Sequence, residues 1–173
     1  MRSTLVLLIL VCLTVGATVV VADNVSVSKM ALVTVDGTIE IGAPPATVWS
    51  ALTDADKVQS WCPIWTQPPM GAKSLATMGA MVAFKDEYGN TGRSVVIYVD
   101  PAKELRIAHV PDNGSYVCQV KFLLEGKGGA TVVKVTEQYS DAMDVPTDRD
   151  TALTTKNGIA KSLTDLKAMA EKK

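Results

Sequence analysis

The sequence has few residues of the kinds that hold metals. It contains one histidine, His109, and three cysteines, and no two of these cysteines form a Cys-x-x-Cys pair. Metal sites in proteins usually draw on a closed set of cysteine and histidine ligands at short spacings. The sequence therefore predicts no metal site and no obligatory cofactor.

Patterns for several other chemistries are also missing. Lysine and arginine do not cluster, and the formal net charge is −1, which excludes the basic surface that nucleic-acid binding requires. There is no G-x-S-x-G motif, and neither Cys62 nor Cys118 has a histidine or basic activator at a recognisable spacing. Gly126, Gly128 and Gly129 precede no helix, so they indicate a hairpin turn and not a phosphate loop. Whether the chain is an enzyme stays open, and the sequence favours a non-catalytic protein.

Residues 1–22 have the pattern of a secretory signal. Arg2 is followed by the apolar run Leu5–Leu13 and by a small-residue site that ends at Ala22. The pattern predicts cleavage there, which leaves one domain of residues 23–173 in a secreted or periplasmic protein. The alternative is an uncleaved anchor, because the low-polarity stretch approaches the length of a membrane span. A membrane partner is expected only in that case.

Two cysteines remain after such a cleavage. An oxidising compartment permits a disulfide between Cys62 and Cys118, provided that the fold brings their backbones within about 7 Å. Two separate buried thiols are the alternative.

The domain begins with a strand that two prolines end. From Ala31–Ile41 the apolar and polar residues alternate, which is typical of a half-buried strand. Pro44 and Pro45 cannot continue a ladder but suit the first turn of a helix. Two short helices are expected next, the second of them capped by Asp54.

Extended segments and turns then alternate up to a long helix. The turn residues between them predict an antiparallel meander, with Gly79 as a break that gives a seventh strand. Apolar residues at helical spacing after Pro146 predict a long amphipathic helix lying on one face of the sheet. The expected strands are Ala76–Lys85, Arg93–Val99, Glu104–Val110, Tyr116–Glu125 and Ala130–Tyr139.

This order of elements resembles the helix-grip fold of the START-like, or SRPBCC, superfamily. The stretch "IEIGAPPATVWSALTDADKVQSW" is similar to the start of its polyketide cyclase and AHSA-type branches, and "VDPAKELR" is similar to a turn between their middle strands. The resemblance implies an α+β fold in which a six to seven stranded antiparallel sheet curves around the C-terminal helix. It also implies a cavity between them for hydrophobic or amphipathic molecules.

Strand parity predicts which side chains would line that cavity. Trp65 stands in a proline-rich loop that the fold would place near the mouth of the cavity. Met78 and Met81 are interpreted as core filling or as a deformable pocket wall. The predicted ligand-binding residues are Trp65, Phe84, Ile107, His109, Tyr116, Cys118, Val120, Phe122, Val133, Val135, Glu137, Ile159, Leu163 and Leu166.

Three functions remain open at this point. The leading hypothesis is an exported protein that binds or transports a small hydrophobic or lipid-like molecule. The second is a cyclase or dehydratase in which His109 moves a proton while Glu137 or Tyr139 orients the substrate. The third is a module that binds a protein partner through an exposed apolar surface.

Overall fold

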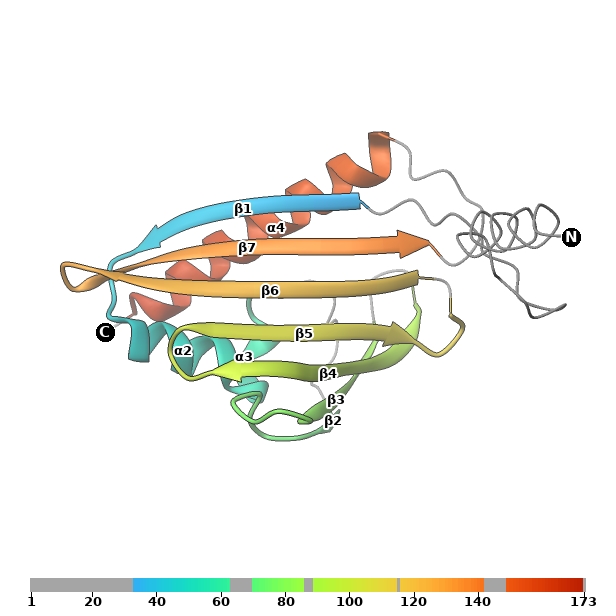
Figure 1. Ribbon diagram of the computed structural model, residues 1–173, viewed down its shortest axis with the longest axis horizontal. Coiled ribbons are helices and arrows are strands. Elements are labelled where there is room, and N and C mark those ends of the chain that lie inside the picture. The colour runs from blue at the N-terminus through green and yellow to red at the C-terminus, as the bar shows by residue number, and fades with distance from the viewer. Residues whose placement is uncertain (1–32, 63–69, 86–88, 115, 142–148, 173) are drawn as a thin grey trace, which may run out of the picture.

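A sheet with a long helix across one face dominates the fold (Figure 1). The structure is a computed structural model that describes residues 33–62, 70–85, 89–114, 116–141 and 149–172. Its elements are β1 (Val33–Ile41), α2 (Pro45–Thr53), α3 (Ala55–Val58), β2 (Met70–Gly71), β3 (Met81–Lys85), β4 (Thr91–Asp100), β5 (Glu104–Pro111), β6 (Tyr116–Lys127), β7 (Ala130–Asp141) and α4 (Arg149–Ala170).

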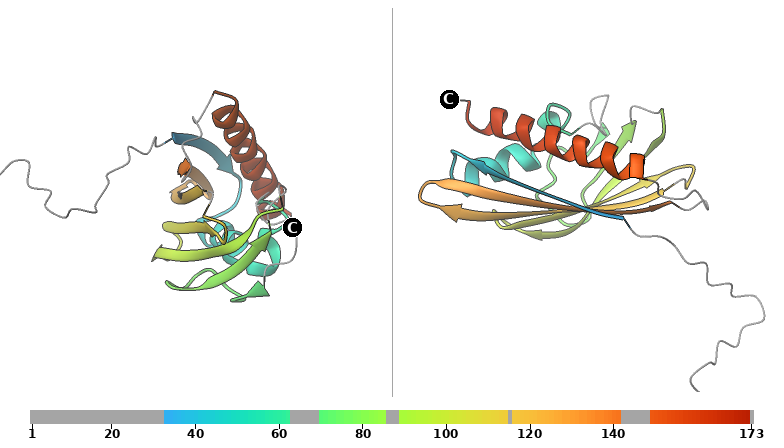
Figure 2. Two further views of the ribbon diagram at one scale, coloured as in Figure 1. Left: turned by 90° about the vertical axis from the view of Figure 1, so that its right-hand side faces the viewer. Right: turned by 90° about the horizontal axis from the view of Figure 1, so that it is seen from above.

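The strands form one seven-stranded antiparallel sheet in the order β1-β7-β6-β5-β4-β3-β2. From β2 to β7 each strand pairs with the next one in the chain, and β7 then pairs with β1. The α4 helix and the short helices α2 and α3 lie on the same side of the sheet (Figure 2). The predicted α+β helix-grip architecture is confirmed. No helix in the described part of the chain combines the length and apolar character needed to span a bilayer.

A glycine lets α4 approach β1 closely. A Cβ atom built on Gly37 would lie 2.7 Å from Ile159 Cγ2 and 2.9 Å from Leu163 Cδ1, both on α4. Such distances are shorter than carbon atoms tolerate, so any larger residue at this position must push the helix away. Ile159, Leu163 and Leu166 are buried at this contact, which is the helix face that the 3.6-residue period predicts.

The corner between β1 and α2 fixes the other end of α4. Pro44 is extended, with φ −66° and ψ 156°, and α2 begins at the next residue. The hydroxyl of Thr131 donates a buried hydrogen bond of 2.7 Å to the carbonyl oxygen of Ala43. Lys167 Nζ on α4 donates to the backbone oxygen of Glu40 at 2.8 Å. These bonds connect β1, β7 and α4 at one end of the sheet.

Asp54 caps α3, as predicted. Its side chain accepts a hydrogen bond of 3.1 Å from the backbone N–H of Asp56. Trp61 follows this helix and is buried, and its ring meets that of Phe122 edge-on with centroids 5.6 Å apart. Trp49 is partly buried against the same core. Both tryptophans therefore pack the short helices against the sheet.

Two details of the strands differ from the sequence-based prediction. The seventh strand is β2, Met70–Gly71, and does not come from a split of the segment around Gly79. Residues 76–79 form bends and turns, in which Gly79 has φ +81°. In β4 the pairing with β5 shifts between Val96 and Tyr98. Because of this irregularity, the residues that face the inner side change from even-numbered to odd-numbered positions along the strand. This explains why apolar residues occur at both even-numbered and odd-numbered positions of this segment.

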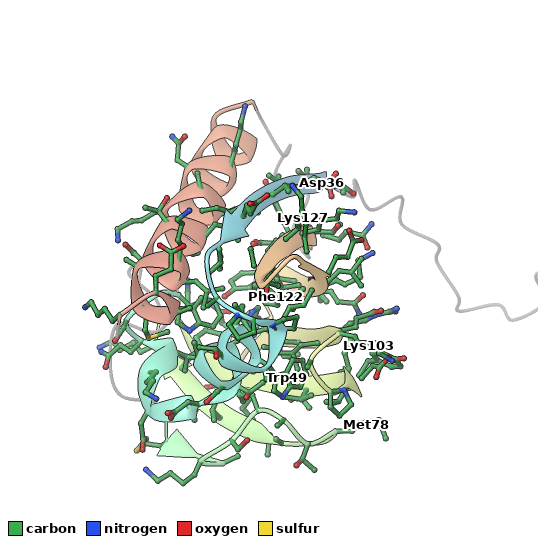
Figure 3. All side chains as sticks on the ribbon, turned by 90° about the vertical axis from the view of Figure 1, so that its left-hand side faces the viewer. Asp36, Trp49, Met78, Lys103, Phe122 and Lys127 are labelled. Atoms are coloured by element: carbon green, nitrogen blue, oxygen red, sulfur yellow. The ribbon has the colours of Figure 1, made fainter. Side chains whose placement is uncertain are left out.

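The methionines are not core residues. Val82 and Phe84 take the buried parity of β3, so Met81 points to the opposite face and is 45% exposed. Met78 lies in the preceding turn and is 70% exposed. Figure 3 shows Phe122 inside the molecule and Met78 at its surface. The interpretation of these two methionines as core filling or pocket wall is wrong, because the parity of a short strand is set by its pairing partner.

Candidate functional site

The site lies on the face of the sheet that packs against α4, here called the inner face. The predicted parity of β5, β6 and β7 places their apolar residues on this face, together with a few polar residues. Arg93 of β4 is exposed on the opposite face. Phe84 of β3 is buried. The buried residues of β5 to β7 and α4 on this face are Leu105, Ile107, His109, Cys118, Val120, Phe122, Leu124, Val133, Val135, Tyr139, Ile159, Leu163 and Leu166.

Two predicted lining residues, Tyr116 and Glu137, are half-buried on the same face. Trp65 lies outside the described residues. The ligand-binding role of all these residues stays a prediction.

A row of polar side chains crosses this apolar face. Ser94 of β4 is paired with His109 of β5, His109 with Cys118 of β6, and Cys118 with Tyr139 of β7. Because directly opposed residues of an antiparallel sheet point to the same side, these four side chains form a continuous row, here called the polar row. All four are buried. The row lies near the end of the sheet where β6 begins, on the right in Figure 1.

His109 is held in a fixed orientation in the polar row. Its Nδ1 is 2.7 Å from the hydroxyl oxygen of Ser94, and the ring of Phe84 meets it edge-on at 6.1 Å between centroids. Burial lowers the pKa of His109 to about 4, because the charged imidazolium loses its hydration. The imidazole is therefore neutral at neutral pH. Sequence reasoning placed His109 on this face by strand parity, but it missed Ser94 entirely.

Cys118 and Glu137 form the second polar contact of the site. The thiol of Cys118 donates to Glu137 Oε1 at 3.4 Å. Burial raises the pKa of the Glu137 carboxyl, and it also raises the pKa of the Cys118 thiol, since both anions would lose hydration. Neither Cys118 nor Cys62 forms a disulfide. Cys118 is thus a neutral hydrogen-bond donor and not an activated nucleophile.

Tyr139 completes the polar row with a hydroxyl that has no partner among the described residues. Its side chain is 7% exposed, and its Oη is buried without a hydrogen bond to any part of the chain that the structure describes. Buried hydroxyls normally have a partner, because an unmade hydrogen bond costs about 1–3 kcal/mol. A hydrogen-bond acceptor that reached this hydroxyl could accept its proton.

The inner face carries no cation among the side chains that the structure describes. The basic residues of the central strands lie on the opposite face, where Arg106 and Lys121 border a shallow hollow with Gln119, Thr136 and Gln138. The described residues also contain no group of three potential metal ligands. The polar row can therefore donate and accept hydrogen bonds, but it supplies no positive charge for an anion.

Most of the chain matches a known protein family. Residues 42–171 match the AHSA1 family, described as "Activator of Hsp90 ATPase homolog 1-like protein". The chain belongs to this family. The resemblance to the START-like, or SRPBCC, superfamily and to its AHSA or polyketide cyclase branch is confirmed. No curated protein matches the chain.

Several solved structures share the fold of this AHSA1-family chain. The Aha1 dimer from Colwellia psychrerythraea is 24% identical, with a TM-score of 0.62 over 80% of this chain and 96% of that one. DynU16, from the dynemicin biosynthetic locus, is 23% identical, with a TM-score of 0.61 over 80% of this chain and 47% of the DynU16 chain. This chain therefore spans about half the length of DynU16. A norcoclaurine synthase from Thalictrum flavum is 11% identical, with a TM-score of 0.62 over 83% of this chain and 97% of that one.

Proposed function

We propose that this AHSA1-family domain binds a small hydrophobic or amphipathic molecule between the inner face of the sheet and α4. The family and the fold support a ligand-binding domain of the SRPBCC superfamily. The observation that carries the proposal is the polar row inside a mostly apolar face, with the Tyr139 hydroxyl left without a partner among the described residues. Ligand sites in proteins have this composition, mostly apolar with a few polar groups that fix orientation.

A neutral fluorescent probe tests the location of the site. N-phenyl-1-naphthylamine should bind the purified protein saturably, with a rise in fluorescence. Val120→Phe narrows the inner face and should weaken binding at least tenfold, which corresponds to about 1.4 kcal/mol. The matched control is Gln119→Phe, the neighbour whose side chain points to the opposite face. Equal affinity in both variants would refute this location, provided that circular dichroism shows both to be folded.

The natural ligand can be sought directly. Protein purified from its native compartment should retain a small molecule that native mass spectrometry detects and solvent extraction releases. The lipid-like class of ligand is part of the proposal, and extraction would identify or reject it.

Export is also part of the proposal. Residues 1–22 have the signal pattern described above, and a domain of residues 23–173 would then act outside the cytoplasm, in the periplasm or as a secreted protein. Amino-terminal sequencing of the native protein should give Asp23 as the first residue. A native chain that still begins at Met1 would contradict export by cleavage.

The cyclase or dehydratase alternative depends on His109 as a proton carrier. His109 lies on the inner face, as that mechanism requires, but its Nδ1 is engaged by Ser94. With a pKa near 4 it is a weak base at neutral pH. Binding without turnover therefore has the better support. Turnover of a bound molecule that His109→Ala abolishes, while probe binding persists, would favour the enzyme instead.

A second surface favours a protein partner as an additional function. The face opposite α4 carries apolar side chains of β2 to β6 that are exposed or, in the case of Val95, partly exposed. They are here called the outer apolar patch: Met70, Met81, Val95, Val110 and Val117. Met81 is paired with Val95, and Val110 is paired with Arg93. Met70 is 75% exposed, and Val110 and Val117 are about half exposed. Exposed apolar groups that adjoin one another in this way are typical of interaction sites.

The charge on this surface indicates the kind of partner. Arg93 stands within the outer apolar patch and is exposed, so a partner segment with apolar side chains around a carboxylate would complement it. If one particular protein binds the wild-type chain in a pull-down, it should no longer bind the Val110→Glu or Arg93→Glu variant. It should still bind the control variant Gln119→Glu. Concentration-dependent dimerisation that the same two variants abolish would assign the patch to a second copy of the chain instead.

A further inference from the structure

Polarity changes along the inner face from one end of the sheet to the other. The polar row occupies one end. The next set of paired residues, Val96, Ile107, Val120 and Glu137, contains only one polar side chain, and the set after it, Leu105, Phe122 and Val135, contains none. Trp61 already covers Phe122 at the apolar end. A ligand on this face would therefore meet apolar side chains along its body and hydrogen-bonding groups at one tip.

The charges on the inner face disfavour an ionised ligand. A buried carboxylate, phosphate or sulfate needs a cation or several donors to replace its hydration. The described side chains of the inner face include no lysine or arginine, and His109 is neutral. Glu137 has the one carboxyl group among the described side chains of this face. This group would repel an anion when ionised, and its burial favours the protonated form.

An ammonium group is disfavoured for a related reason. The Glu137 carboxyl is the only acid among the described inner-face residues, and its Oε1 already accepts a hydrogen bond from Cys118. A cation would have to be desolvated against a carboxyl group whose surroundings oppose ionisation. Neither sign of charge is thus matched on this face.

The Tyr139 hydroxyl supplies the specific interaction. A phenolic hydroxyl can donate one hydrogen bond, and here no described residue accepts it. A carbonyl or hydroxyl oxygen is the simplest neutral group that would accept it. The apolar body of such a molecule would then extend along Ile107 and Val120, which adjoin the polar row on their strands.

We infer that the ligand is an uncharged molecule with an apolar, aromatic or alicyclic body and one carbonyl or hydroxyl oxygen at its tip, which accepts a hydrogen bond from Tyr139. This inference rests on the proposed function and adds the chemical class of the ligand. It separates neutral ketones, phenols and alcohols from fatty acids, phospholipid head groups and amines.

A matched set of naphthalene compounds tests the inference. Each compound displaces N-phenyl-1-naphthylamine from the folded, full-length protein: 2-acetylnaphthalene as a neutral ketone, 2-ethylnaphthalene without an acceptor, 2-naphthoate as an anion and 2-naphthylmethylammonium as a cation. The ketone should displace the probe at concentrations at least tenfold below those of either ion. Tyr139→Phe should weaken the ketone about tenfold and leave 2-ethylnaphthalene unchanged.

The control variant and the contrary outcomes complete the test. Tyr98→Phe removes a hydroxyl from the opposite face, where Tyr98 is exposed under the guanidinium of Arg106, and should change nothing. Tighter binding of the naphthoate or of the ammonium compound would overturn the inference, and so would an equal loss for the ketone and the hydrocarbon in Tyr139→Phe. If the wild-type protein binds no compound of the set and no probe, the proposed function itself fails and the inference falls with it.

Discussion

Protonation of His109 should destabilise the fold as the pH falls. The pKa of His109 is lowered from 6.5 to about 4 by burial, whereas in the unfolded chain it returns to its ordinary value. Between these two pH values the unfolded state binds a proton that the folded state does not bind. The free energy of unfolding therefore falls as the pH drops through 6.5, and the loss is complete below about pH 4.

The size of this loss follows from the shift. Each pKa unit corresponds to about 1.4 kcal/mol, so the shift of His109 is worth about 3 kcal/mol between neutral pH and pH 4. This is a large part of the 5–15 kcal/mol that stabilise a typical domain.

Two other groups change the pH dependence in opposite directions. Glu137 has a raised pKa, so the folded state takes up its proton more readily than the unfolded state, and its contribution to stability grows as the pH falls. Asp54 has a pKa lowered mainly by its hydrogen bond with Lys57, so its contribution is lost as the pH falls through the acid range. Variants are needed to separate His109 from both.

Urea unfolding at several pH values between 4 and 7 measures the effect. In His109→Gln the side chain can still bond to Ser94 but cannot titrate, and the decline in unfolding free energy over this range should be about 3 kcal/mol smaller than in the wild type. Glu137→Gln serves as the control and should make the decline steeper. Parallel wild-type and His109→Gln curves would refute the argument, because they would mean that burial does not keep this histidine neutral.

Three further predictions concern packing and reactivity. Gly37→Val should lower the free energy of unfolding by about 1–3 kcal/mol in urea, because the valine side chain would overlap Ile159 and Leu163 on α4. The control Thr38→Val lies on the exposed face of the same strand and should have little effect in the same measurement. Thr131→Val keeps the shape of the side chain but leaves the buried carbonyl of Ala43 without its donor, so thermal and urea unfolding should show a loss of about 1–3 kcal/mol; an unchanged midpoint would contradict the role given to this bond. Cys118 should react with iodoacetamide only as fast as the protein unfolds, since burial raises the pKa of its thiol, and peptide mass spectrometry that finds rapid labelling in the native state would contradict this.

Much of the inner face could be predicted from the sequence because side-chain direction in a strand is a local property. Alternation in the segments of β5, β6 and β7 was enough to place Ile107, Val120 and Val135 on one side, and the structure buries all three there. The same alternation put His109 and Glu137 on that side. Their exposure could not be read in this way, because it depends on which other elements cover the end of each strand.

The wrong predictions for β2 and β3 and the irregularity in β4 have a common cause. A two-residue strand such as β2 has no period of its own and exists because it pairs with β3. Met81 faces outward because its neighbours Val82 and Phe84 face inward, and the apolar composition of the segment does not reveal this choice. The irregularity at Val96 likewise depends on pairing with β5.

The sequence by itself determined the fold of this protein, and the tertiary structure decided its site. Alternating strands, the prolines at Pro44 and Pro45, and the helical period after residue 149 are local signals, and together they are sufficient for the helix-grip architecture. The contact between Ser94 and His109, and that between Cys118 and Glu137, join different strands in register. The protonation of these groups and the unpartnered hydroxyl of Tyr139 depend on burial by residues distant in the chain, which no local pattern records.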